Sequence, residues 1–187
     1  MKIVVKFGGS SLASAKQFKK VADIIRADKA RRYVVPSAPG KRNDKDEKVT
    51  DLLYQCYDAA SQGKSYKKIL DKIRDRYEEI IDGLHLNVNL DHEFQTIEEN
   101  FVAGLGREYA ASRGEYLNGI LMANYLGIPF IDAAEVLRLR KGRKDPHLFQ
   151  RRFRYHRFHC SPGHPRRSLR ELDGRVRIPG GGSQNRG

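Results

Sequence analysis

The stretch Lys2-Ile3-Val4-Val5-Lys6-Phe7-Gly8-Gly9-Ser10-Ser11 opens the chain and decides how the rest of the sequence is interpreted. Its first half, residues 2–6, is a short β-branched run that is typical of a strand. The run ends at two glycines, and residues 13–27 then carry apolar side chains at helical spacing. A strand that passes through glycines into a helix presents backbone N–H groups to a phosphate. The stretch therefore predicts an α/β fold with a phosphate-binding turn.

Lys6 adds to this prediction because it stands at the strand end beside Gly8 and Gly9. A cation there offsets charge on a transferring phosphoryl group, while the glycines let backbone donors approach its oxygens. The stretch is neither a Walker A loop nor a G-x-G-x-x-G motif. The alternative interpretation of the two glycines is a tight turn that binds no ligand.

The rest of the first 137 residues alternates between apolar strands and amphipathic helices. Four helices are predicted after the second strand: one that starts at Thr50, one over residues 66–81, one over residues 92–111, and one from Gly114 to about residue 127. Residues 33–35 and 128–132 are predicted strands, and residues 41–48, nearly all charged or polar, are a predicted mobile loop. This order favours a three-layer α/β/α sandwich with a mostly parallel sheet.

Composition divides the 187 residues into two parts. Residues 1–137 hold 21 Lys and Arg against 20 Asp and Glu, whereas residues 138–187 hold 15 against 3, so the net charge of +13 comes almost wholly from the second part. Arginine also replaces lysine there, and the helical periodicity ends. We therefore expect a domain over residues 1–139 and a disordered basic tail rich in Arg, Pro and Gly over residues 140–187.

Several protein classes are excluded by simple counts. No apolar run approaches the roughly 18 residues of a membrane-spanning helix, and the run after Lys2 is too short for a secretory leader. Two cysteines, Cys56 and Cys160, cannot build a disulfide framework. These observations predict a cytoplasmic protein without a membrane partner.

Three further positions are weak signals when each is taken singly. Ser37 follows the second predicted strand, Thr50 opens a helix, and Gly114-Glu115 opens another. A turn residue, a helix cap and a carboxylate in a first helical turn are the simple explanations. Their order along the chain, however, forms a pattern.

Four segments in this order resemble the motifs of aspartate kinases, in the amino acid kinase superfamily. The segments are Lys6-Phe7-Gly8-Gly9-Ser10-Ser11, Val35-Pro36-Ser37-Ala38-Pro39-Gly40-Lys41, Val49-Thr50-Asp51-Leu52-Leu53 and Arg113-Gly114-Glu115-Tyr116-Leu117. Residues 128–137 resemble the strand that follows in that family. The resemblance covers about residues 1–140, and it is specific because the motifs keep the family's order.

The resemblance implies an enzyme that uses ATP and Mg²⁺ to phosphorylate the side-chain carboxylate of L-aspartate. This transfer is the first step toward lysine, threonine and methionine, and the family is commonly homo-oligomeric. Lys6 would be the catalytic residue that contacts the transferring phosphate. Gly8, Gly9 and Ser10 would bind the phosphate groups, and no residue is assigned as a metal ligand.

The resemblance also implies that Ser37 and Thr50 help to hold aspartate and that Glu115 pairs with its ammonium group. A carboxylate substrate needs hydroxyl and backbone donors, and an ammonium group needs an acceptor. A glutamate 5-kinase or an acetylglutamate kinase is the alternative within the superfamily. Glu115 and the Ser37/Thr50 pair favour aspartate.

The family completes its site with a later Arg-Gly-Gly-Ser-Asp segment, and this sequence contains only Gly180-Gly181-Gly182-Ser183. The tail permits two other functions. Residues 138–144 and 151–157, interleaved with aromatic residues, are a possible polyanion-binding surface, although no specific nucleic acid is expected. The second possible function is a zinc site. Its ligands would be four residues whose spacing matches no known zinc finger: His156, His159, Cys160 and His164.

We predict that the reading frame of the gene shifts near residues 139–144, which leaves a truncated and inactive kinase. The jump in charge, the change from lysine to arginine and the loss of periodicity near residue 137 all motivate this expectation. The check is to translate the nucleotide sequence after codon 139 in the other two frames. One frame should encode a segment like Arg-Gly-Gly-Ser-Asp; if neither does, the tail needs a function of its own.

Overall fold

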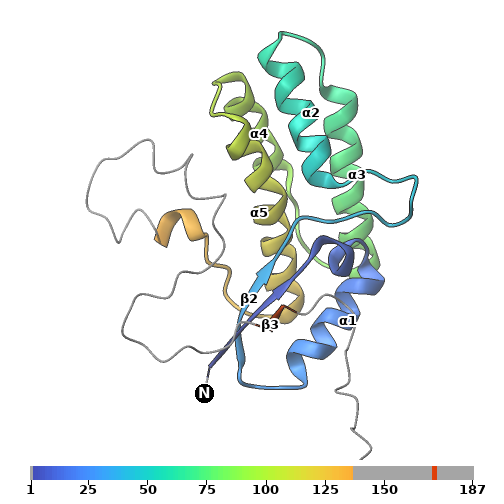
Figure 1. Cartoon of the computed structure of the whole chain (residues 1–187), viewed down its shortest axis with the longest axis vertical. Helices are drawn as coiled ribbons and strands as arrows, with labels where there is room; N and C mark the ends of the chain where they lie inside the picture. Colours follow the sequence, from blue (N-terminus) through green and yellow to red (C-terminus); the bar gives the residue numbers. More distant parts are fainter. Residues whose placement is uncertain (1, 137–169, 172–187) are drawn as a thin grey trace, which may run out of the picture.

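A computed structural model describes residues 2–136 and 170–171 of the chain (Figure 1). Its elements, in chain order, are β1 (Ile3–Phe7), η1 (Gly9–Leu12), α1 (Ala15–Arg26), β2 (Arg31–Pro36), α2 (Val49–Ser61), α3 (Lys67–Leu84), α4 (Asp91–Val102), α5 (Arg107–Leu126) and β3 (Arg170–Glu171). Helices dominate, and the strands pair in parallel. The predicted α/β class with a parallel sheet is confirmed.

The sheet has the order β2-β1-β3, so the opening stretch of the sequence forms its central strand. Val5 pairs in register with Val34, and Lys6 pairs with Val35. Val5 and Phe7 are buried, as the period-two pattern of a strand requires. Because β1 and β2 are parallel, both end at the same edge of the sheet, where the chain continues into Gly8 and Ser37.

The core forms where the apolar faces of the helices meet. Helix α1 buries Phe18, Val21, Ala22 and Ile25, at the spacing that the sequence predicts. Helix α2 packs against α3, α4 and α5; Figure 1 shows α2, α3 and α4 beyond the ends of β1 and β2, and α5 continuing down alongside the strands. Phe101 of α4 contacts Tyr57, Tyr66 and Tyr109 in edge-to-face geometry, which joins the helices through aromatic side chains.

The predicted helix over residues 92–111 is wrong, because the chain breaks earlier. Helix α4 ends at Val102, and Gly104 and Gly106 have φ values of 71° and 98°, which favour glycine. Helix α5 then begins at Arg107 and runs through Gly114 without interruption. Gly114 therefore has a packing role: a Cβ atom there would lie 2.7 Å from the Cβ of Ala38.

The predicted strand over residues 128–132 is also wrong. These residues form no strand, and Asp132 accepts a hydrogen bond from the backbone N–H of Ala134 at the start of a short helical turn. The apolar residues of this stretch pack locally. The ring of Phe130 lies edge-to-face on Tyr116 and close to Gly119 of α5, while Ile131 is 66% exposed. A strand needs a hydrogen-bonded neighbour, and none of the described strands pairs with residues 128–132.

Most of the predicted tail, residues 140–169 and 172–187, lies outside the described residues, and so do the proposed polyanion and zinc sites. Its one described piece, β3, pairs with Val5 and Lys6 of β1. None of the helices over residues 2–136 is long and apolar enough to cross a membrane.

Candidate functional site

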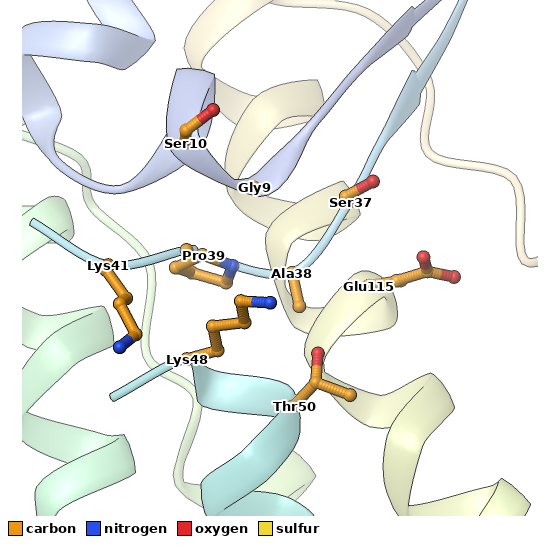
Figure 2. A pocket seen from close by; sticks show the side chains of 10 residues that line it. Gly9, Ser10, Ser37, Ala38, Pro39, Lys41, Lys48, Thr50 and Glu115 are labelled. Atoms are coloured by element: carbon orange, nitrogen blue, oxygen red, sulfur yellow. The ribbon is translucent and has the colours of Figure 1, made fainter. Parts of the chain in front are cut away.

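A cavity of about 520 Å³ lies at the edge of the sheet where β1 and β2 end. The side chains and backbone that line it come from η1, from the loop after β2, from the start of α2 and from α5: Gly9, Ser10, Ser37, Ala38, Pro39, Gly40, Lys41, Lys48, Thr50 and Glu115 (Figure 2). Ligands of parallel α/β folds bind at the carboxyl ends of the strands, so the position of this cavity fits that rule.

Two glycines let the turn after β1 touch the loop after β2. The backbone N–H of Gly40 donates to the carbonyl oxygen of Gly9 at 2.8 Å. A Cβ atom on Gly40 would lie 2.6 Å from the carbonyl carbon of Gly9, and one on Gly9 would lie 2.8 Å from the oxygen of Ala38. No other residue type fits at either position without moving backbone. The floor of the cavity is therefore formed by the backbone of the two segments that follow β1 and β2.

Five of the seven predicted site residues line this cavity. Gly9 and Ser10 come from the predicted phosphate turn, and Ser37, Thr50 and Glu115 from three separate elements. Lys6 and Gly8 are not among the lining residues. Lys6 belongs to the central strand, where it pairs with Val35. The next residue, Phe7, accepts a hydrogen bond at its carbonyl oxygen from the N–H of Ser37 at 3.0 Å. The catalytic and binding roles of all seven residues stay predictions.

The cavity also contains two cations that the sequence analysis did not select. Lys41 and Lys48 flank the charged loop over residues 41–48, and both line the cavity. Figure 2 shows Ser37, Thr50 and Glu115 toward one side, with Lys41 on the other and the Lys48 side chain extending between them. The arrangement places an acceptor and two hydroxyl groups at one side, the Lys41 ammonium at the other and the Lys48 ammonium between them.

Two buried polar side chains support the wall that carries Glu115. Asn118, fully buried one turn after Glu115 on α5, donates from Nδ2 to the carbonyl oxygen of Ser37 at 2.6 Å. The hydroxyl of Tyr77, buried on α3, donates to the carbonyl oxygen of Gly114 at 2.8 Å. Burial raises the pKa of Tyr77 well above its usual value, so this hydroxyl stays a donor. Neither residue has a signal in the sequence beyond its place on an apolar helix face.

Arg76 of α3 is the buried charge of this region, with 4% of its side chain exposed. Its guanidinium donates to Asp46 Oδ2 at 2.8 Å and to the backbone oxygens of Gly40 at 2.7 Å and Glu47 at 3.2 Å. The loop over residues 41–48, predicted to be mobile, thus has specific partners. An arginine on the apolar stripe of the predicted helix 66–81 was the available signal, because a buried cation needs partners.

The cavity does not by itself form a metal site. Over the part of the chain that the structure describes, no three His, Cys, Asp or Glu side chains lie together as metal ligands. Glu115 is the sole carboxylate among the lining residues. The chemistry of the described residues is therefore that of anion and ammonium binding: glycine backbone, hydroxyl groups, two ammonium groups and one carboxylate.

The described residues thus combine a parallel α/β fold, a glycine turn and a cavity with charged and hydroxyl groups at the strand ends. The chain belongs to the amino acid kinase family, which matches residues 1–172. This match continues past residue 139, the predicted end of the domain, and includes β3. The proposed change of reading frame at that boundary stays a prediction.

The most informative relatives are aspartokinases. Aspartokinase 3 of Bacillus subtilis strain 168 is 45% identical over 87 residues, which is 46% of this chain and 19% of that protein. The crystal structure of Clostridium acetobutylicum aspartate kinase is 48% identical with a TM-score of 0.68, covering 72% of this chain and 31% of that one. The crystal structure of E. coli aspartokinase III in complex with aspartate and ADP is 25% identical with a TM-score of 0.53, covering 68% of this chain and 29% of that one. The chain thus spans less than a third of each relative.

The ion pair of Asp46 generates a pH-dependent prediction. Burial raises the pKa of Asp46, but hydrogen bonds from Arg42 and the charges of Arg76 and Arg42 outweigh it and hold the pKa at about 2, below the usual 3.8. A depressed pKa stabilises the fold above pH 4, and this contribution disappears as the pH falls toward 2. Asp46→Asn should therefore lower the free energy of unfolding by about 1–3 kcal/mol at pH 7.

The measurement is thermal or urea unfolding of both proteins from pH 7 to pH 2. The difference between them should shrink between pH 4 and pH 2, because the wild-type carboxylate becomes protonated there. Asp44→Asn, in the same loop without a described contact to Arg76, is the matched control. A difference that stays constant over this pH range would show that Asp46 acts without its charge.

Proposed function

We propose that this chain forms the aspartate-binding part, and half of the phosphate-binding part, of an aspartate kinase site. The enzyme would transfer the γ-phosphoryl group of ATP to the side-chain carboxylate of L-aspartate. The observation that carries the proposal is the cavity that brings Ser37, Thr50 and Glu115 together with the glycine backbone at the ends of β1 and β2. The chain would serve the first step of lysine, threonine and methionine synthesis.

The charged groups of L-aspartate match the groups on the side of the cavity that carries Glu115, Ser37 and Thr50. Its α-ammonium group needs an acceptor without a competing donor, which the Glu115 carboxylate supplies. Its carboxylates need donors, which the hydroxyl groups of Ser37 and Thr50 supply. Asn118 and Tyr77 hold Ser37 and Gly114 by buried hydrogen bonds, so the binding groups are in place before the substrate enters.

The phosphoryl transfer itself needs positioning and charge neutralisation. A side-chain carboxylate is already a nucleophile: its oxygen attacks the γ-phosphorus, the bond to the β-phosphate oxygen breaks, and ADP leaves. Lys6 would offset the developing charge, and Gly8, Gly9 and Ser10 would donate to the phosphate oxygens. Mg²⁺ bound to the phosphates of ATP would neutralise part of their charge.

The comparisons support aspartate over the other acceptors of the superfamily. The relatives named above are aspartokinases, and one of them was crystallised with aspartate and ADP. A glutamate 5-kinase or acetylglutamate kinase has no such support. We further propose a cytoplasmic enzyme that forms homo-oligomers. Burial raises the pKa of the Cys56 thiol to about 12, so this cysteine is an unreactive part of the core.

A chimera tests the proposal in a complete active site. Residues 1–136 replace the matching part of the C. acetobutylicum aspartate kinase, and ADP release is followed with ATP and aspartate. Lys6→Ala should lower kcat at least 100-fold with little change in KM, because its contact strengthens in the transition state. Glu115→Gln should raise KM for aspartate at least 10-fold, because the ammonium contact already exists in the substrate complex.

Glu108→Gln is the matched control, because Glu108 lies on the same helix but does not line the cavity. It should leave both constants within twofold. Equal and small effects of Lys6→Ala and Glu115→Gln would contradict the assigned roles. A chimera that phosphorylates glutamate as well as aspartate would contradict the assigned substrate.

A further inference from the structure

We infer that Arg76, which does not line the cavity, is a positioning residue that sets the places of Lys41 and Lys48 within it. The inference deepens the proposed function, because it explains how that site obtains its two cations. It rests on the contacts of one guanidinium group with both ends of a single loop.

The contacts are placed immediately before each lysine. Arg76 Nη2 donates to the carbonyl oxygen of Gly40 at 2.7 Å, and Gly40 directly precedes Lys41. Arg76 Nη1 donates to the carbonyl oxygen of Glu47 at 3.2 Å, and Glu47 directly precedes Lys48. The same guanidinium therefore fixes the backbone from which both ammonium groups enter the cavity. A planar group with several donors in fixed directions suits this task.

The guanidinium also joins the loop to the phosphate turn. Its Nη2 lies 3.4 Å from the carbonyl oxygen of Ala13, at the end of η1. The loop is thereby held against the element that carries Gly9 and Ser10, and the hydrogen bond from Gly40 N–H to Gly9 oxygen lies beside this contact. Arg76 thus links three segments that meet around the cavity: η1, residue 40 and residues 46–47.

The charge balance explains why an arginine is tolerated in this buried place. Asp46 Oδ2 accepts from Arg76 Nη1 at 2.8 Å, and its side chain is 13% exposed. Arg42 donates to the same Asp46 oxygen from its side chain at 2.9 Å and also contacts Glu79 of α3. The loop folds back on itself through the Arg42–Asp46 contacts, and Arg76 anchors the folded loop to α3.

The test compares Arg76→Lys with the wild-type chain, full length in both cases. Lysine keeps the charge near Asp46 but cannot reach both carbonyl oxygens at once. By NMR, the amides of Gly40 and Val49, which donate to Gly9 and Pro39, should exchange at least 10-fold faster, while core amides of α3 and α5 change less than threefold. Aspartate affinity, measured by titration calorimetry, should fall at least fivefold, because the displaced ammonium groups of Lys41 and Lys48 no longer attract the carboxylates of aspartate in the cavity.

Arg74→Lys is the matched control, because Arg74 is on the same helix and contacts Asp91 and Phe94 away from the loop. It should leave loop exchange and aspartate affinity unchanged. Asp46→Asn approaches the same contact from the loop side and should speed the same two amides, which keeps the test valid if Arg76→Lys folds poorly.

Unchanged amide hydrogen exchange at Gly40 and Val49 in both Arg76→Lys and Asp46→Asn would overturn the inference. Faster exchange at these amides with full aspartate affinity would also overturn it. A wild-type chain that does not bind aspartate, with loop exchange still dependent on Arg76, would instead count against the proposed function and leave the loop assignment supported.

Discussion

The structure depends on one close approach of backbone to backbone, between Gly9 after β1 and Gly40 after β2. Parallel strands bring these two turns to the same sheet edge, but side chains normally keep such turns apart. Here the absence of Cβ atoms lets Gly40 N–H donate to the Gly9 oxygen at 2.8 Å. The cavity forms around this contact, so its floor presents peptide groups, which are suited to phosphate oxygens.

The walls are then fixed by buried polar side chains that belong to helices behind the cavity. Arg76 and Tyr77 are neighbours on α3, yet they hold opposite walls: the loop of Lys41 and Lys48, and the Gly114 backbone before Glu115. Asn118 adds a third bond, to Ser37. Buried polar groups are costly unless they are paired, so the bonds from Arg76 Nη1 and Nη2, the Tyr77 hydroxyl and Asn118 Nδ2 favour one arrangement of the site, while Arg76 Nε and Asn118 Oδ1 have no partner among the described residues. Preorganisation of this kind is what an enzyme that acts by positioning requires.

Much of this arrangement could be predicted from the sequence, for reasons visible in particular residues. The run over residues 2–6 predicts a strand, the glycines after it predict a turn whether or not that turn binds phosphate, and parallel strands place Gly9 and Ser37 at one edge. The wrong predictions share a different cause. Gly114 suggested a helix break, but it packs against Ala38, and the real break needed the positive φ values of Gly104 and Gly106. Residues 128–132 had an apolar pattern without a strand partner among the described residues, and Arg76 acquires its role from segments 29 to 63 residues away.

The most direct measurement of the central claim is the position of bound aspartate on the full-length chain. In a ¹³C-labelled protein with unlabelled aspartate, intermolecular NOEs report which methyl groups lie near the aspartate methylene protons. Binding in the cavity at the strand ends should give NOEs to the methyl groups of Thr50 and Ala38, both of which line it. NOEs to Val88 or Ile81, in the smaller cavity between α3 and α4, or none at saturating aspartate, would contradict the claim.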